Sequence, residues 1–277
     1  MTYSCFELEK RGSLAHISFN RPDQLNSMTV DFYAELRDAV HSLDSAGGTR
    51  VLIISSTGKH FSAGMDLSVF EQGDLLKTDS TLDRENLRDV VLSLQNAFTT
   101  LEKARFPVIA AVQGGCIGAG VDLASACDLR YATADSFFCI QEINIGIMAD
   151  LGTLQRLPRL IPDGIARELA YTGDRLAADK AKALGLVNEV FATQEEMMAF
   201  VEEVAKRIAA RSPLAVSASK QALTYARDHS VDQSLRWAAD WQSAILDTKQ
   251  IYECFVAKKE KREPVFPDLR PRSTRLN

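Results

Sequence analysis

Two loops in the sequence carry backbone groups that could bind an oxygen atom as it becomes negatively charged. Residues 63–67 read Ala-Gly-Met-Asp-Leu and residues 119–123 read Ala-Gly-Val-Asp-Leu, so both loops share the pattern Ala-Gly-x-Asp-Leu. Each follows an apolar run that predicts a buried strand, and glycines crowd the second loop between Gly114 and Gly120. Free N–H groups at a helix start can stabilise an oxyanion. The repeated pattern therefore predicts a hole to which each loop contributes one N–H group.

Two other interpretations of the glycine-rich loop compete with the oxyanion hole. A phosphate-binding loop requires Gly-x-Gly-x-x-Gly or a terminal Lys-Ser/Thr pair, and the order Gly115, Gly118, Gly120 followed by Val121-Asp122 satisfies neither pattern. A tight turn that lets a helix pack closely on a sheet is the default for an isolated glycine cluster. The second loop with the same pattern favours the oxyanion hole over the turn.

The elements that must position these loops alternate between strands and helices. Strands are predicted at residues 6–10, 14–19, 51–55 and 108–112, with a helix from Thr29 to Gly47 and a long helix through 87–101 that ends before Pro107. Beyond about Leu151 helices dominate, at residues 164–171, 177–184, 195–210, 213–227 and 231–246, with one strand at 187–191. The pattern predicts an α/β core whose central strands are covered on both faces, residues 1–192, followed by a helical region, residues 193–277.

The composition excludes several classes of function. The 277 residues carry 32 basic and 37 acidic side chains, and the net charge of −5 does not favour nucleic acid or an anionic membrane as a partner. The four histidines and five cysteines show no metal-ligand spacing, so we expect no metal, no cofactor and free thiols. No stretch is apolar enough to span a membrane, and the acidic N-terminus does not resemble a signal peptide. We expect a cytoplasmic protein.

The chain resembles the enoyl-CoA hydratase/isomerase, or crotonase, superfamily along nearly its whole length. The matching segments, in order, are NRPDQLNSM (20–28), HFSAGMDL (60–67), PVIAAVQGGCIGAGVDLASACDLRYAT (107–133), FCIQEINIGIMADLGTLQRLPRLI (138–161), ALGLVNEV (183–190), SPLAVSASKQAL (212–223) and FVAKKEKREPVF (255–266). The resemblance implies a ClpP/crotonase-like fold of stacked ββα units with a helical C-terminal region. It also implies an acyl-CoA thioester substrate and assembly into homotrimers or hexamers, the latter as dimers of trimers.

The resemblance assigns the two loops to the substrate. The N–H groups of Met65 and Ala119 would form the oxyanion hole around the thioester oxygen, although many relatives have glycine where Ala119 stands. The implied substrate-binding residues are Ala63, Gly64, Met65, Asp66, Leu67 and Ala119. Coenzyme A would enter as part of the substrate, and no other cofactor is implied.

Three acids decide which branch of the family the chain resembles. Asp122, Glu142 twenty residues later and Asp150 eight residues beyond resemble the Δ3,5-Δ2,4-dienoyl-CoA isomerases, and so does RDHSVDQSL at 227–235. In that branch Asp150 would take a proton at C2, Glu142 would deliver one at C6, and Asp122 would orient the group near the hole. The reverse assignment of Glu142 and Asp150 is the alternative.

Each acid also has a structural interpretation. Asp122 could cap the helix that begins near it, and Asp150 could pair with Arg156. The three acids together, at the family's spacing, favour the catalytic interpretation. The competing functions are an enoyl-CoA hydratase and a crotonase scaffold that binds RNA without catalysis.

Overall fold

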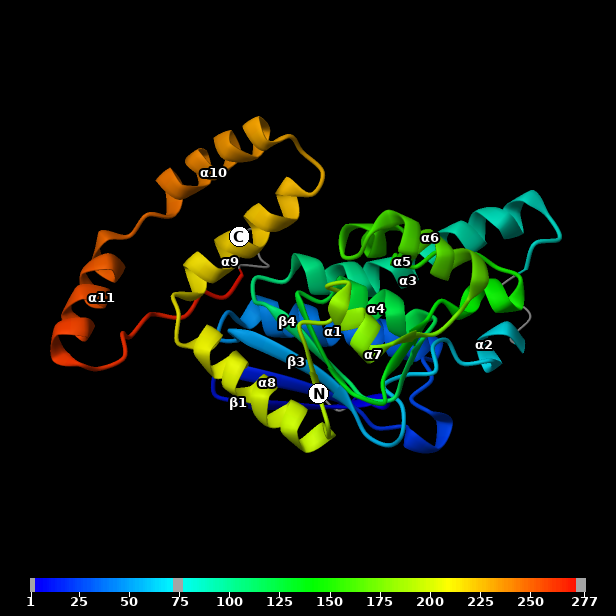
Figure 1. Ribbon diagram of the computed structural model, residues 1–277. Helices are drawn as coiled ribbons and strands as arrows, with labels where there is room; N and C mark the ends of the chain where they lie inside the picture. Colours follow the sequence, from blue (N-terminus) through cyan, green and yellow to red (C-terminus); the bar gives the residue numbers. More distant parts are fainter. Residues whose placement is uncertain (1–2, 72–76, 273–277) are drawn as a thin grey trace.

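A six-stranded sheet runs through the computed structural model of the chain, which describes residues 3–71 and 77–272 (Figure 1). The strands are β1 (Phe6–Arg11), β2 (Leu14–Phe19), β3 (Val51–Ser56), β4 (Val108–Val112), β6 (Leu129–Thr133) and β9 (Glu189–Phe191), in the spatial order β1-β2-β3-β4-β6-β9. β1 and β2 form the predicted antiparallel hairpin, and all later neighbours pair in parallel. The carboxyl ends of the parallel strands therefore lie at one edge, where the two Ala-Gly-x-Asp-Leu loops begin.

Both faces of the sheet are covered, as the sequence predicted. Helices α1 (Val30–Ala46), α3 (Thr81–Lys103) and α4 (Ala119–Ala126) pack on one face, and α8 (Gln194–Ala209) packs on the other. The strand β3 divides its side chains between the two cores, because alternate residues point to opposite faces. Leu52 and Ile54 join the first core, and Val51 and Ile53 join the core against α8. This explains why β3 is an uninterrupted apolar run.

A second, three-stranded sheet carries the glycine-rich loop. It consists of β5 (Gly115–Ile117), β7 (Phe137–Cys139) and β8 (Leu176–Ala177), with β5 and β7 parallel. These short strands were not predicted from the sequence, because two or three residues are too few to show a period. Their pairing brings the segment after β5 next to the segment after β7.

Shorter helices complete the core. They are η1 (Pro22–Gln24), α2 (Ser68–Glu71), η2 (Gln141–Ile145), α5 (Thr153–Arg156), η3 (Leu157–Arg159), α6 (Asp163–Thr172) and α7 (Ala178–Ala183). The helix α1 begins and ends where its sequence predicts, whereas α3 (Thr81–Lys103) begins before the predicted start at residue 87. Gly47 ends α1 with a φ of 78°, and Ser80 begins α3 with a capping box completed by Asp83.

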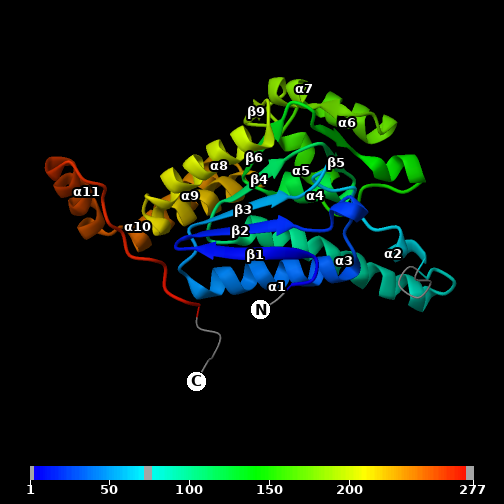
Figure 2. The ribbon, with the colours of Figure 1, turned by 90° about the horizontal axis from the view of Figure 1, so that it is seen from below.

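The C-terminal region leaves the core after α9 (Pro213–Ala226). The helices α10 (Val231–Ile245) and α11 (Thr248–Glu260) extend away from the sheet, and we call them the C-terminal arm (Figures 1 and 2). α11 was not predicted. The segment after it returns to the core, where Phe266 O accepts a hydrogen bond from Arg50 Nη2. The division at residues 192 and 193 stays a prediction, and α8, just beyond it, packs on the sheet.

Within the described ranges, 3–71 and 77–272, no helix combines the length and the apolar character needed to cross a bilayer.

Candidate active site

The two Ala-Gly-x-Asp-Leu loops meet. Ser62 N donates to Gly115 O at 3.1 Å, and Ile117 N donates to Ser62 O at 3.0 Å, so the loop after β3 pairs with β5 like a short strand. Gly64 has a φ of 87°, and a Cβ atom there would lie 2.7 Å from Ile117 O and 3.3 Å from Ala119 N. The glycine therefore allows the first loop to approach the start of α4 closely.

The N–H groups of Met65 and Ala119 have no protein acceptor at this meeting point, as far as the described residues show. By contrast, the N–H groups of Ala63, Gly64, Asp66 and Gly118 donate to Leu25 O, Ser62 Oγ, Met28 O and Cys139 O at 2.9 to 3.1 Å. Ala119 is also the first residue of α4, where the helix dipole favours negative charge. The two groups predicted to form an oxyanion hole are thus available to a ligand.

The pairing of β5 with β7 brings Glu142 beside this hole. Gly118 follows β5 with a φ of 53°, and Glu142 lies in η2, three residues after β7 ends. A Cβ atom on Gly118 would lie 3.3 Å from Glu142 Oε1. Gly118 thus leaves room for this carboxyl group next to Ala119. The other carboxyl oxygen of Glu142, Oε2, is buried and has no hydrogen-bond partner among the described residues.

Asp122 lies one turn into α4 and is fully buried. The predicted alternative, that it caps α4, is wrong: the N-cap is Gly118, and no side chain caps this helix. Asp122 Oδ1 instead accepts a hydrogen bond from the Thr153 N–H at 2.6 Å, at the start of α5. Its Oδ2 is buried without a partner in the described part of the chain.

Asp150 lies in the loop before α5, and its alternative pairing with Arg156 is also wrong. Arg156 Nη2 bonds to Glu102 at 2.7 Å, with both side chains nearly buried. Gln95 in α3 donates to Asp150 O at 2.6 Å and so holds the backbone of this loop. Asp150 is only partly buried and borders a polar cavity of about 480 Å³. Solvent can therefore reach this acid more easily than Asp122.

The three acids influence one another electrostatically. Burial raises the pKa of Asp122 to about 6, against the opposing effects of the Thr153 hydrogen bond and of Arg156. Burial, and then the charge of Asp122, raises the pKa of Glu142 to about 7. Burial also raises the pKa of Asp150. Near neutral pH this group of carboxyls therefore holds both a proton to donate and a charged oxygen to accept one.

Asp66 and Leu67 differ from the other predicted substrate-binding residues. The Asp66 carboxylate accepts hydrogen bonds from Ser27 Oγ at 2.6 Å and from Ser68 Oγ at 2.7 Å, and these bonds lower its pKa to about 2. Asp66 thus supports the loop that presents Met65. Leu67 is 71% exposed, with its side chain open to solvent.

Sequence reasoning missed several residues that shape the site. His60 Nδ1 accepts the Gly115 N–H at 2.8 Å and so fixes the glycine-rich loop. Gln95 holds the Asp150 loop, Thr153 holds Asp122, and Tyr33 of α1 is buried near the acids. They lie on four different segments, and nothing in the local sequence marks the contact that each one makes. Only the three-dimensional fold brings them together.

The comparisons with known proteins agree with this geometry. A sequence profile described as Enoyl-CoA hydratase/isomerase matches residues 9–269. This chain belongs to the enoyl-CoA hydratase/isomerase family. The predicted family and the fold that it implies are therefore confirmed.

Individual relatives refine the position of the chain in the enoyl-CoA hydratase/isomerase family. It is 42% identical over 275 residues to the peroxisomal Delta(3,5)-Delta(2,4)-dienoyl-CoA isomerase of Arabidopsis thaliana, covering 97% of this chain and 99% of the relative. It is 41% identical to the mitochondrial isomerase of the same name from Mus musculus, covering 90% and 77%. The crystal structure of an enoyl-CoA hydratase from Bacillus anthracis superposes with a TM-score of 0.86 at 31% identity, covering 95% and 99%.

Proposed function

We propose that this chain is a Δ3,5-Δ2,4-dienoyl-CoA isomerase that shifts two double bonds of an acyl-CoA thioester during fatty-acid β-oxidation. The observation that carries the proposal is the third acid: Asp150 joins Asp122 and Glu142 around the hole formed by Met65 and Ala119. The names of the relatives at 41 and 42% identity support the same reaction.

The reaction requires proton transfers at two distant carbons. A base removes a proton from C2, and the electrons move into an extended enolate whose oxygen is stabilised by the N–H groups of Met65 and Ala119. An acid then delivers a proton to C6, so the double bonds move from positions 3 and 5 to positions 2 and 4. No electrons are gained or lost, and the proposed reaction uses no redox or metal cofactor. Because C2 and C6 lie four bonds apart, two carboxyl groups are needed.

The environments of the acids support Asp150 as the base and Glu142 as the acid. Burial and the charge of Asp122 raise the pKa of Glu142 to about 7, so this carboxyl group holds a proton in part of the molecules near neutral pH. Asp150 is less enclosed and borders the polar cavity, where a charged carboxylate is better solvated. Each turnover leaves a proton on Asp150 and removes one from Glu142. Exchange with solvent through the cavity would restore the starting state.

A substrate panel tests this function. Purified protein should convert a 3,5-dienoyl-CoA into its conjugated 2,4 isomer, followed by the growth of diene absorbance. Crotonyl-CoA should be hydrated far more slowly. Faster hydration of crotonyl-CoA would identify a hydratase instead, the activity named for the structural relative at 31% identity. The RNA-binding scaffold is not favoured, because the acids are intact and the net charge is −5.

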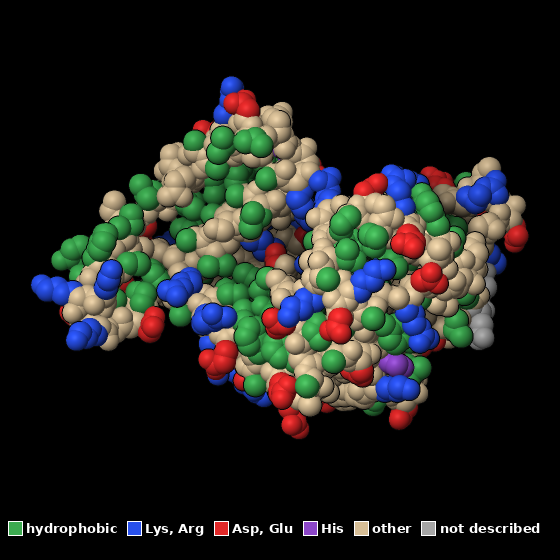
Figure 3. All heavy atoms as spheres, viewed as in Figure 1, with side chains coloured by type: hydrophobic (Ala, Val, Ile, Leu, Met, Phe, Trp, Pro, Cys, Tyr) green, Lys and Arg blue, Asp and Glu red, His purple; other side chains and the backbone are tan. Residues whose placement is uncertain are grey.

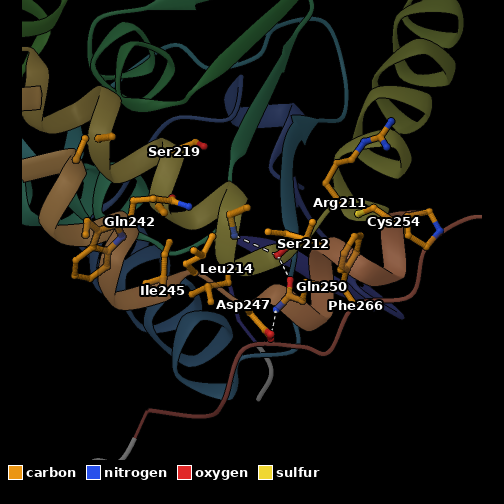
Figure 4. A pocket seen from close by; sticks show the side chains of 18 of the residues that line it. Arg211, Ser212, Leu214, Ser219, Gln242, Ile245, Asp247, Gln250, Cys254 and Phe266 are labelled. Carbon is orange, nitrogen blue, oxygen red and sulfur yellow. Dashed lines mark hydrogen bonds between the residues drawn. The ribbon is translucent and has the colours of Figure 1, made fainter. Parts of the chain in front are cut away.

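We further propose that the chain assembles as a homotrimer, alone or as a dimer of trimers. Hydrophobic side chains gather on the C-terminal arm (Figure 3), and the largest exposed ones include Val231, Leu235, Tyr252 and Phe255, each at least 66% exposed. An open groove of about 540 Å³ lies between α9 and the arm, lined mainly by apolar side chains such as Leu214, Ile245 and Phe266 (Figure 4). A second copy of the chain would cover these surfaces.

Sedimentation and imaging test the remaining expectations. The assembled protein should sediment with three or six times the chain mass of 30.5 kDa.

The cytoplasmic location that we propose rests on the free cysteines, which form no disulfide in the described chain. The names of the relatives carry peroxisomal and mitochondrial locations instead, and imaging of the tagged protein decides between them. EDTA should leave turnover unchanged if no metal takes part.

A further inference from the structure

A short parallel ladder of hydrogen bonds joins the two Ala-Gly-x-Asp-Leu loops. Ser62 N donates to Gly115 O at 3.1 Å, and Ile117 N donates to Ser62 O at 3.0 Å, which is the regular pattern of a parallel pair. Met65 follows Ser62 by three residues, and Ala119 follows Ile117 by two. The relative position of the Met65 and Ala119 N–H groups therefore depends on this ladder.

The ladder is bulged at its other end, where His60 begins the first loop. In a regular parallel pair, the next two bonds would run from His60 N to Gln113 O and from Gly115 N to His60 O. Phe61 N donates to Gln113 O instead, at 2.8 Å. His60 O accepts a hydrogen bond from Asn26 Nδ2 at 2.9 Å. The bulge thus takes away the backbone acceptor that the Gly115 N–H would have in a regular ladder.

The imidazole ring of His60 supplies the acceptor in place of the carbonyl group. Gly115 N donates to His60 Nδ1 at 2.8 Å. The ring lies against the backbone, because a Cβ atom on Gly114, whose φ is 55°, would come within 2.9 Å of Nδ1. Phe137 of β7 packs edge to face on the ring, with the centroids 6.2 Å apart. The ring is therefore fixed in the position where it completes the ladder.

This bond requires a neutral imidazole. A backbone N–H group can only donate, so Nδ1 must carry a lone pair and the proton of the neutral ring must lie on Nε2. Protonation would place a second N–H group against the Gly115 N–H. Burial lowers the pKa of His60, the charges of Lys59 and Arg175 lower it further, and the charge of Asp135 raises it. The surroundings of the ring thus favour its neutral form.

We propose that His60 is a positioning residue of the oxyanion hole, because its neutral imidazole joins the two loops by accepting the Gly115 N–H. Protonation of the ring opens this joint and moves the N–H groups of Met65 and Ala119 out of place. Since the folded pKa lies below the ordinary value, the joint is intact at neutral pH and is lost as pH falls through the folded pKa. The catalytic consequence rests on the proposed isomerase function, whereas the joint itself does not.

Two substitutions separate the acceptor from the space that the ring fills. His60→Asn keeps an acceptor on the γ carbon, and this oxygen does not titrate. His60→Leu keeps a branched side chain and removes the acceptor. Near neutral pH, His60→Leu should lower kcat for the 3,5-dienoyl-CoA by about 10- to 100-fold, with a smaller change in KM, because a misplaced hole loses stabilisation of the enolate. His60→Asn should stay within about threefold of wild type. His41→Leu, at an exposed histidine of α1, is the control and should keep kcat.

The pH dependence tests the protonation of His60 itself. The acids of the site are the same in wild type and His60→Asn, so their titration cancels in the ratio of the two kcat/KM values. The ratio of His60→Asn to wild type should rise as pH falls from about 7 to about 5, because only the wild type loses the joint. A ratio that does not change with pH would overturn the proposal.

Hydrogen exchange tests the joint without any substrate. Mass spectrometry of peptides that cover residues 113–118 reports the protection of the Gly115 N–H in the assembled protein, even if the wild type turns over no dienoyl-CoA. Near neutral pH this segment should exchange about tenfold faster in His60→Leu and at the wild-type rate in His60→Asn. Unchanged exchange in a folded His60→Leu protein would overturn the proposal. Equal acceleration in both variants would do the same, since the ring would then only fill space.

The comparison of wild type with His60→Asn decides the case if His60→Leu does not fold. At about pH 5 the wild type should exchange the 113–118 segment faster than His60→Asn, after correction for the intrinsic exchange rate at that pH. Equal protection of the two proteins at this pH would overturn the proposal. If the exchange results are as expected but no dienoyl-CoA is turned over, the proposed reaction is wrong and the joint stands.

Discussion

The carboxyl groups of the site lie inside the α/β core, whereas the large apolar side chains of the C-terminal arm lie outside it. Asp122 is fully buried, and one oxygen of Asp122 and one of Glu142 lack partners among the described residues. Leu235 and Phe255 of the arm are 66% and 68% exposed. Both arrangements lower the stability of the folded chain. A buried charge loses its hydration, and an exposed apolar side chain contributes none of the stabilisation that burial would give.

The difference shows what each region lacks. In the core, backbone hydrogen bonds hold the segments that carry two of the acids: the Thr153 N–H donates to Asp122, and Gln95 donates to the carbonyl of Asp150. The arm shows the opposite arrangement, because its large apolar side chains are exposed to solvent. Its helix α10 contributes no buried residue and α11 contributes Ala257, yet both are well-formed helices. The exposed apolar faces of the arm support the proposed assembly with a second copy of the chain.

Removing the charge of Asp150 should lower turnover, and this should be the largest effect of all the substitutions. Asp150→Asn keeps the shape of the side chain but removes the proton acceptor, so turnover should fall by about 10² to 10⁴, or about 3 to 5 kcal/mol in the barrier. Glu142→Gln should fall comparably, and substrate binding, measured by titration, should survive in both. Because the acids act in one relay, the double variant should lose much less than the product of the two losses.

The outcome for Asp150→Asn separates its possible roles. Turnover near that of wild type would remove Asp150 from the chemistry. Loss of binding together with turnover would show that Asp150 holds its loop in shape, which Gln95 also does through the Asp150 carbonyl.

Gly64→Ala should disturb the oxyanion hole without touching an acid. The added methyl group would approach Ile117 O at 2.7 Å, at a φ of 87°, and would push the Met65 loop away from Ala119. Losing one donor from an oxyanion hole costs about 10²- to 10³-fold in kcat. Gly12→Ala is the matched control: its φ is also positive, at 62°, but nothing lies within 4 Å of the new Cβ. It should lose about 1 kcal/mol of stability and keep kcat.

The site and the arm were not equally predictable from the sequence. The loops were found because they repeat a local pattern, and the acids were found through the resemblance to the family. The helices α1 and α3 were found because their apolar spacing is local, although the Ser80 cap of α3 was missed. His60, Thr153 and Tyr33 were missed. His60 and Thr153 bond to residues 55 and 31 positions away, and a single sequence does not display such contacts.

The strands β5 and β7 were missed for the same reason, because they depend on contacts with a distant part of the chain. β5 and β7 exist because they pair with each other, and each has only three residues. The helix α11 was missed although Ile251, Tyr252 and Phe255 stand at helical spacing in it, and its end is rich in lysine. By contrast, α9 was predicted, and the structure adds that its buried Lys220 bonds to Asp128 at 2.8 Å and to Leu101 O at 2.7 Å. This contact anchors α9 on the core, so the arm begins after it.

Leu235→Asp tests the arm as an assembly surface. Leu235 is exposed in the single chain, so the substitution should leave the fold of the chain intact. At an interface it would lose the burial of a leucine and place a charge in apolar surroundings, and the dissociation constant should rise by about 10²-fold. Light scattering across a dilution series measures this. Arg236→Ala, at a neighbouring position that is 79% exposed, is the control. Wild type and Leu235→Asp dissociating alike would exclude this face of α10.

Asp122→Asn should have the smallest effect. It tests how much the buried carboxyl group of Asp122 lowers the free energy of unfolding. Because the folded pKa of Asp122, about 6, lies above its ordinary value, folding takes up a proton between about pH 4 and pH 6. The folded state therefore loses stability as pH rises through this range, and the loss is complete above it.

Asparagine cannot ionise, so the variant should match the wild type near pH 4 and exceed it by about 2 kcal/mol at pH 8. Urea unfolding at fixed protein concentration, with wild type and Asp122→Asn at both pH values, measures the difference, and Asp179→Asn on an exposed face is the control. If the variant were more stable than the wild type by the same amount at pH 4 and at pH 8, the charge of Asp122 would not be what destabilises the folded protein. The comparison between core and arm would then rest on the exposed apolar faces alone.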